Sequence, residues 1–310
     1  MPTPRKRIVD DDAVGSYHLI SRCVRQCRLC GDGLEHRRDW IEDRIAELQK
    51  SMGIELTAWN ILSNHLHILA TNRPDLARLW SDREVAIRWL RMCPGTWLRR
   101  KRGIAADSPP TDDEIAAIIG DKTRVEILRR RLSSISWFMG RLKEHVSRRA
   151  NAEDGCTGAF WERRFRSVRV LDEPSQLATS TYIDLNAVRA GMVDRPESTS
   201  HGSISERVAI ASGRDRRTCI RMSPPPLGSN EAYIEHVDAC GRWQVTQGKA
   251  SIPTSMPPIL ERLELTKKRW LELFRLGWGN LRGTVIGTPE SRRGEAERRR
   301  GRWVIDPLAS

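Results

Sequence analysis

The chain has 310 residues, with 53 lysines and arginines against 40 aspartates and glutamates, which gives a net charge of +13. This length is enough to bury a sizeable core, and no apolar run approaches the roughly 18 residues of a membrane span. The positive surplus favours a polyanionic partner, most simply a nucleic acid.

The first third of the chain predicts the order strand, helix, strand, strand, which opens a ferredoxin-like antiparallel sheet. The strand segments are rich in β-branched and aromatic residues, and the helical segment places apolar residues three or four positions apart. Ser63 and Asn64 form a turn that makes the second and third strands a hairpin. The predicted segments are residues 16–24, 36–53, 54–62 and 65–71.

Helical patterns dominate the middle of the chain. Residues 73–134 are charged and predict a helical insertion into the sheet domain. A long helix with one apolar stripe is predicted from about Asp121 to Asn151. Residues 167–172 can supply a last strand, and residues 174–191 predict a helix that ends at a glycine. The fold class is therefore α+β.

The composition changes beyond residue 200. Two proline-rich segments are followed by a basic amphipathic helix at residues 259–277 and an arginine-rich segment at residues 291–303, expected to be a mobile tail. We therefore divide the chain into a domain over residues 1–200 and a basic, helical C-terminal extension over residues 201–310. The amino-terminal residues lack the apolar stretch of a secretory signal, so we expect a cytoplasmic protein.

Two histidines lie one residue apart in the third strand. Because side chains of a strand alternate between faces, His65 and His67 project from the same face. Two imidazoles on one face are the minimum for a metal site or a phosphate-handling site. The alternative is a pair of polar residues on an open sheet face. His18, on the first strand, is a further ligand or an orienting residue, Asn64 closes the turn, and no carboxylate is placed as a third ligand.

Three cysteines follow the first strand at C-x3-C-x2-C spacing. Cys23, Cys27 and Cys30, with His36 beyond them, make a zinc site conceivable. No second pair of cysteines completes the site, and Cys23 falls within a predicted strand. Reduced thiols are the expected state in a chain of this kind.

The residues Asn64-His65-Leu66-His67 form a His-hydrophobic-His (HUH) pattern. Together with three other stretches, the pattern resembles the REP-associated tyrosine transposases, a branch of the single-tyrosine HUH transposases. The four stretches are GSYHLISRCV, NILSNHLHILA, WFMGRLKEHVSRRAN…GCTGAFWERRFRS and YIDLNAVRAGMV.

The resemblance implies a strand-cutting site on a ferredoxin-like sheet, used in DNA transposition on single-stranded or hairpin DNA. His65 and His67 would bind a divalent metal ion, Mg or Mn, which polarises the scissile phosphate. A tyrosine on the long helix would attack and leave a phosphotyrosine link. Related transposases can work as dimers, which allows a homodimer here.

The expected nucleophile is missing from the long helix. An ungapped comparison puts Val146 and Arg149 where the family's long helix carries tyrosine, and the chain has three tyrosines in all. Three accounts remain open. Tyr182 or Tyr233 substitutes, the latter across a dimer; a metal-activated water cuts the DNA; or the protein is a catalytically impaired relative that binds DNA without strand transfer. An RNA-binding protein on the same fold has less support, because paired exposed aromatics are lacking.

Basic side chains on the polar side of the long helix, and just after it, are the predicted phosphate contacts. The alternative is an ordinary solvated helix face. Phe160 and Trp161 could stack on bases, but packing is favoured. The predicted DNA-binding residues are Arg141, Lys143, Arg148, Arg149, Arg163, Arg164 and Arg166.

Overall fold

The computed structural model describes residues 8–105, 108–193, 195–242 and 285–298. The predicted basic helix at residues 259–277 lies outside these ranges. No helix in the described part of the chain combines the length and the apolar character that a membrane span requires.

The centre of the molecule is a five-stranded sheet with the strand order β2-β3-β1-β4-β5. Its first four strands are antiparallel neighbours, in the order of a ferredoxin-like sheet, so the predicted α+β class is confirmed. β5 adds a short parallel partner for β4 that the sequence analysis did not predict. The strands are β1 (Gly15–Arg22), β2 (Ile54–Ile61), β3 (His65–Asn72), β4 (Arg166–Val170) and β5 (Val285–Ile286).

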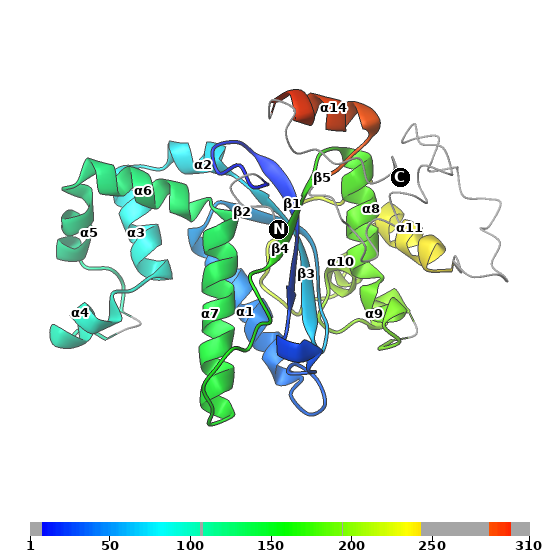
Figure 1. Cartoon of the computed structure of the whole chain (residues 1–310), viewed down its shortest axis with the longest axis horizontal. Coiled ribbons are helices and arrows are strands. Elements are labelled where there is room, and N and C mark those ends of the chain that lie inside the picture. Colours follow the sequence, from blue (N-terminus) through cyan, green and yellow to red (C-terminus); the bar gives the residue numbers. More distant parts are fainter. Residues whose placement is uncertain (1–7, 106–107, 194, 243–284, 299–310) are drawn as a thin grey trace.

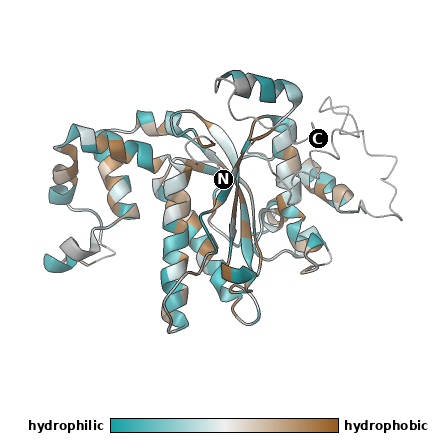
Figure 2. Ribbon diagram, viewed as in Figure 1, coloured by the Kyte–Doolittle hydropathy of each residue, from teal (hydrophilic) through white to brown (hydrophobic). Residues whose placement is uncertain are grey.

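Two long helices cover one face of the sheet, α1 (His36–Ser51) and α7 (Ile135–Glu153). Their apolar stripes, with Ile45 and Val146 among them, join Ile68 of β3 in the largest buried cluster. Figure 2 shows apolar residues along the strands and hydrophilic ones on the outer side of the helices. Burial of this kind contributes roughly 25 cal/mol per Å² of apolar surface, which makes this layer the main core.

The helical insertion lies between β3 and α7 and extends to one side of the sheet (Figure 1). Thr111 and Glu114 form a reciprocal capping box at the start of one of its helices. The insertion consists of α2 (Pro74–Leu79), α3 (Asp82–Met92), α4 (Thr96–Lys101), α5 (Asp112–Ile119) and α6 (Lys122–Leu132).

The long helix expected from Asp121 to Asn151 is two helices, α6 and α7. Ser133 and Ser134 separate them, and Ser134 has extended backbone angles. The carbonyl of Leu132 accepts a hydrogen bond of 2.9 Å from the Gly53 amide instead of continuing the helix. A contact between distant segments therefore ends α6, and no local pattern predicts it.

A second layer of helices covers the other face of the sheet (Figure 1). The helix expected over residues 174–191 is present as two helices joined at Leu185, and Gly191 follows them with a φ of +66°. Residues beyond 200 contribute two further helices to this layer. Its members are α8 (Glu173–Asp184), α9 (Asn186–Arg189), α10 (Ser203–Ala211) and α11 (Asn230–Arg242).

The last described helix, α14 (Pro289–Arg298), follows β5 at the edge of the sheet. Its buried Glu295 forms an ion pair of 3.1 Å with Arg169 of β4. Residues 291–298, which we expected in a mobile tail, are therefore helical and joined to the sheet.

Candidate functional site

The register of the sheet brings three histidines to one face. His67 lies opposite Ile20 of β1, and Ile20 lies opposite Arg166 of β4. His65 is two residues before His67, and His18 is two residues before Ile20. Because side chains directly opposite each other or two residues apart share a face, all three imidazoles and Arg166 project toward the layer of α8.

The three imidazoles are in contact. Nε2 of His18 lies 2.9 Å from Nδ1 of His67, and the rings of His65 and His67 have centroids 5.0 Å apart. Nδ1 of His65 donates to Oδ1 of Asn64 at 2.6 Å, so the hydrogen bond between His65 and the side chain of Asn186 falls to its Nε2. If Nδ1 of His67 donates to His18, then Nε2 of His67 keeps a lone pair for a metal ion.

Tyr182 of α8 lies against these imidazoles. Its ring centroid is 5.5 Å from that of His67 and 5.9 Å from that of His18, edge-on to both. The side chain of Asn186 forms hydrogen bonds with those of Tyr182 and His65. A phenol, an amide and three imidazoles therefore meet between β1, β3 and α8.

Local contacts explain why Tyr182 reaches the histidines. Oδ1 of Asp172 caps the start of α8 by accepting a 2.9 Å hydrogen bond from the Ser175 amide. Further along, Nδ2 of Asn60 on β2 donates to the carbonyl of Ile183 at 2.9 Å. Ile183 and Tyr182 also share a buried cluster with Leu69 of β3. These contacts hold the helix directly over the strands.

Burial keeps the three imidazoles neutral. It lowers the pKa of His18 to about 3, with a further lowering by Arg166. Burial and then Arg22 lower the pKa of His65 to about 4. Burial, helped by its two histidine neighbours, holds the pKa of His67 well below its ordinary value. At neutral pH the three rings therefore carry no charge and can act as ligands.

Opposing influences act on the Tyr182 hydroxyl. Burial raises the pKa of Tyr182 above its ordinary value, and the hydrogen bond from Asn186 and the charges of Arg22 and Arg166 only reduce that rise. Both arginines are exposed. A negatively charged group that approached from solvent would meet these two guanidinium groups near the phenol.

A pocket of about 740 Å³ opens beside His65. Asn64 lines it from the hairpin turn, and Arg28, Arg38 and His201 line it from other segments. His65 is partly exposed, whereas His67 and His18 are buried. The pocket therefore gives solvent or a ligand access to His65, while His67 and His18 do not line it.

The predicted DNA-binding residues fall into two groups. Arg163 and Arg164 precede β4, and Arg166 begins it on the face of the histidines. The remaining four lie on α7, in the layer that covers the opposite face of the sheet: Arg141, Lys143, Arg148 and Arg149. The structure thus brings Arg166 to the histidines and separates the α7 residues from them.

Phe160 and Trp161 are buried, as the packing interpretation predicts. The indole N–H of Trp161 donates to the carbonyl of Lys143 on α7 at 3.1 Å. These aromatics therefore attach the segment before β4 to α7.

The other two tyrosines are buried elsewhere. Tyr17 is fully buried and accepts a 3.0 Å hydrogen bond from the amide of Asp10. Tyr233 of α11, also fully buried, donates to Asp184 at 2.7 Å, so it has no free hydroxyl to offer across a dimer. Of the three tyrosines, only Tyr182 contacts the histidines.

Arg22 and Asn186 are site residues that sequence reasoning missed. Arg22 lies four residues after His18 on a strand, so period-two spacing could have indicated it. Asn186 follows a break between two helices, and no sequence pattern predicts where that break leaves its side chain.

Within the described residues, one group of three potential ligands has its atoms within 4.8 Å of one another: Asp39, Glu42 and His201. Arg217 already forms ion pairs with Asp39 and Glu42, so a cation occupies the position that a metal would take. The cysteines that suggested zinc form no such group in this part of the chain. Among the described residues, no carboxylate joins His18, His65 and His67 in a group of this kind.

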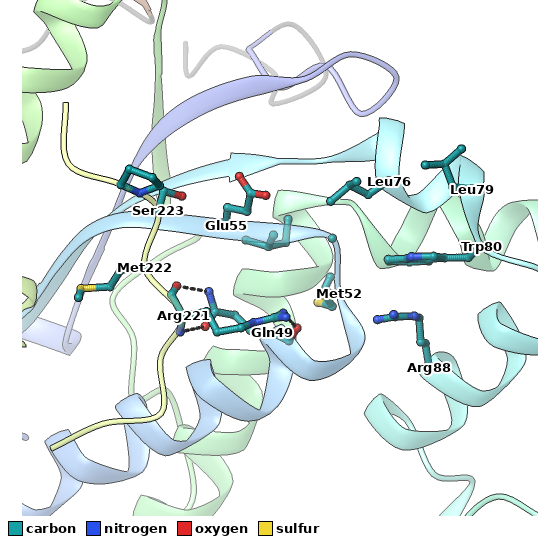
Figure 3. Close-up of a pocket in the computed structure, with 13 residues that line it drawn as sticks. Gln49, Met52, Glu55, Leu76, Leu79, Trp80, Arg88, Arg221, Met222 and Ser223 are labelled. Atoms are coloured by element: carbon teal, nitrogen blue, oxygen red, sulfur yellow. Dashed lines mark hydrogen bonds between the residues drawn. The ribbon is translucent and has the colours of Figure 1, made fainter. Parts of the chain in front are cut away.

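A separate pocket of about 430 Å³ lies at the edge of β2 (Figure 3). The guanidinium of Arg88 lies 4.1 Å from the centre of the Trp80 ring, and two hydrogen bonds join Gln49 to the Arg221 backbone. Arg88 also forms an ion pair with Glu84. The pocket contains none of the site residues described above.

No family model and no curated protein matches the chain. One solved structure does, that of a REP-associated tyrosine transposase bound to a REP hairpin. The two share 14% identity over 68% of this chain and 87% of the other, with a TM-score of 0.41. At this level the likeness carries no argument about function, which has to come from the site itself.

Proposed function

We propose that this chain is a DNA strand-cleaving protein of the HUH type, with His65 and His67 as ligands of a divalent metal ion and Tyr182 as the nucleophile. The observation that carries the proposal is the contact between the Tyr182 ring and His67, with centroids 5.5 Å apart in the interior of a basic protein. A nucleophile beside a pair of neutral imidazoles is what metal-assisted phosphoryl transfer requires.

The residues present fit a metal ion in part. With the Nδ1–H of His67 donating to His18, Nε2 of His67 could bind the ion, and Nε2 of His65 could bind it once it releases Asn186. A bound Mg or Mn would supply a Lewis acid for a phosphate oxygen. Since the described residues supply no third ligand from a carboxylate, the remaining positions would fall to water and to the phosphate itself.

The residues of the chain would carry out the remaining chemistry. Oη of Tyr182 would form a bond to phosphorus while the bond from phosphorus to the 3′ oxygen breaks, which leaves a 5′-phosphotyrosine and a free 3′-OH. The phenolic proton would be taken up by the departing 3′ oxygen; burial raises the pKa of Tyr182, and Asn186, Arg22 and Arg166 oppose that rise. The same two arginines would balance the charge that accumulates on the phosphate.

DNA is the polyanion that suits this site best. Arg163 and Arg164 extend the positive charge of Arg166, and Arg28 and Arg38 line the pocket beside His65. Arginine forks bind phosphate in pairs of hydrogen bonds. A single-stranded or hairpin substrate follows from the motif resemblance and belongs to the proposal.

A second candidate is a DNA-binding protein without strand transfer. The observation that favours it is the burial of Tyr182, whose residue exposure is 8%, together with the missing carboxylate ligand. A third outcome, cleavage by a metal-activated water, needs the histidines but not the tyrosine.

One assay separates the three. The protein is incubated with Mn and a labelled hairpin that carries a single-stranded flank, and then denatured. We expect a protein–DNA adduct that is lost in Tyr182→Phe and kept in Tyr233→Phe. Free cut ends without an adduct would indicate a nuclease, and retarded but intact DNA would indicate binding alone.

A further inference from the structure

A basic pocket of about 610 Å³ lies on the other layer of the molecule, between α1, the end of α3 and α7. Figure 1 shows α1 and α7 on the side of the sheet away from α8. The uncharged residues that line the pocket are Met92, Cys93 and Pro94, at the end of α3. The charged and titratable lining consists of Arg44, Arg91, Arg141, Arg148, Arg149, His145, Glu47 and Glu144.

The carboxylates of the pocket do not balance its arginines. Glu144 forms ion pairs with both Arg141 and Arg148, and Glu47 with Arg44. Arg91 and Arg149 form none with any described carboxylate. Five guanidinium groups against two carboxylates leave an excess of three positive charges in one pocket. Arg91, Arg148 and Arg149 are exposed, so this excess is available to attract an anion from solution.

Two arginines of the pocket have a buried nitrogen without a hydrogen-bond partner among the described residues. The Nε atoms of Arg44 and Arg141 are buried and have no hydrogen-bond partner in the described part of the chain. Arg44 is largely buried, with its side chain 11% exposed. Buried polar atoms are nearly always paired in folded proteins, so these two nitrogens show that the described residues leave the arginines of the pocket incompletely satisfied.

His145 lies among the arginines of the pocket and can serve as a probe of its charge. It is half-buried on α7, and its pKa is lowered first by burial and then by Arg44, against Glu47, with Arg149 lowering it further. An anion held in the pocket would act in the opposite direction and raise this pKa.

We propose that this pocket binds phosphodiester groups of a DNA backbone, on the face of the sheet opposite to the three histidines. Guanidinium forks bind phosphate oxygens in pairs. No tryptophan, tyrosine or phenylalanine of the described chain lines the pocket, so the base of a free nucleotide would lack a large ring to stack on, whereas a backbone needs none. Arg91 comes from the helical insertion, which gives that insertion a role in holding DNA.

That the ligand of this pocket is DNA rests on the proposed function. The test therefore measures DNA binding in the absence of metal ions, so that it does not depend on cleavage. Anisotropy of a labelled single strand is measured against salt, in EDTA, with Tyr182→Phe as the background. In the variant Arg91→Gln with Arg148→Gln we expect weaker binding and a shallower salt slope, by about 1.4, or about 0.7 for each phosphate contact.

The matched control is Arg83→Gln with Arg124→Gln, two exposed arginines of the insertion that do not line the pocket. This control loses the same charge and is expected to keep the wild-type slope. Equal losses in both variants would overturn the inference, because they would mean that only bulk charge matters. That result would leave the cleavage assay, and the proposal for Tyr182, untouched.

A second measurement identifies the anion. We expect the NMR titration of the His145 ring to shift to higher pH when the oligonucleotide is added, and to stay unshifted in Arg91→Gln with Arg148→Gln. A shift produced by millimolar inorganic phosphate and not by DNA would overturn the backbone proposal in favour of a small-anion site.

Discussion

Nε2 of His18 on β1 lies 2.9 Å from Nδ1 of His67 on β3, and both rings are buried. One hydrogen bond between neighbouring strands therefore holds the orientation of the deeper imidazole of the proposed metal pair. Partners of this kind fix the tautomer of a ligand and raise its basicity. His18 is thus a positioning residue for His67.

Replacing His18 is expected to weaken metal binding. His18→Phe keeps a flat ring of similar size but removes the hydrogen bond, so we expect Mn affinity to fall about 10- to 100-fold. His18→Gln can restore a hydrogen bond and is expected to recover part of the loss. Calorimetric titration with Mn measures both, with His36→Phe as the control. Unchanged affinity in His18→Phe would contradict the positioning role.

Replacing Asn186 is expected to move the pH profile of cleavage. The hydrogen bond from Asn186 lowers the pKa of Tyr182, so Asn186→Ala should raise that pKa further. Below the pKa, the phenolate fraction at a given pH falls about tenfold for every pH unit by which the pKa rises. Because the pKa of Tyr182 is already raised above its ordinary value of 10, the single-turnover rate has to be followed above that pH, where it should level off at a higher pH in the variant than in the wild type. A uniform loss with an unmoved profile would mean that Asn186 is only structural, and Asn151→Ala serves as the control.

Asp184 is expected to make stability fall as pH rises. Burial raises its pKa to about 6, against the hydrogen bonds from Ser203 and Tyr233 that lower it. Between the ordinary value of 3.8 and about 6, the folded protein holds a proton that the unfolded chain has released, so the free energy of unfolding decreases with pH across that window.

Asp184→Asn removes this proton exchange. The unfolding free energy of the variant minus that of the wild type should rise by up to ~3 kcal/mol from pH 4 to pH 7. Any pH-independent difference between the two proteins adds to this rise and does not change it. Urea unfolding at several pH values measures the difference. The exposed Asp215→Asn is the control. A difference from wild type that stays constant across this range would show that Asp184 titrates normally.

A chain that ends at residue 200 is expected to lack a cooperative unfolding transition. Oγ of Ser203 donates to Asp184 at 2.5 Å and accepts from the Trp59 amide at 3.0 Å, and Arg207 donates to the Thr57 carbonyl at 2.7 Å. Without residues beyond 200, Asp184 of α8 loses its partners Ser203 and Tyr233, and the helix loses part of its buried cluster. Thermal unfolding followed by circular dichroism tests this.

The control for the truncation is a chain that ends at residue 298, which keeps every described residue. A sharp transition in the 1–200 fragment would support the domain boundary that composition predicts at this point. A broad or absent transition would place α10 and α11 within the same folding unit as the sheet.

The fold was predictable to the extent that its signals are local. Period-two alternation and the Ser63-Asn64 turn indicated the hairpin, and the order of elements indicated the sheet topology. The break at Ser133 and Ser134 was not predictable, because it depends on Gly53, which is far away in sequence. β5 is only two residues long and was missed for lack of any pattern.

The histidines of the site could be predicted from the sequence, but the position of the tyrosine could not. Strand alternation placed His65 and His67 on one face, and the structure agrees. The tyrosine was sought on the long helix, but α7 covers the opposite face from the histidines, whereas α8 brings Tyr182 to them. Which helix covers which face is a property of tertiary packing, so spacing in the sequence could not decide it.

β5 has a consequence for how the protein is made. From Val170 at the end of β4 to Val285 at the start of β5, about 115 residues must leave the ribosome before the two strands can pair. At ordinary synthesis rates this takes roughly 6 to 23 s. For that interval the nascent chain presents β4 as an open edge, the kind of surface through which strands of separate chains join. Translation speed and chaperone supply, rather than the stability of the finished molecule, would then decide how much of it escapes aggregation.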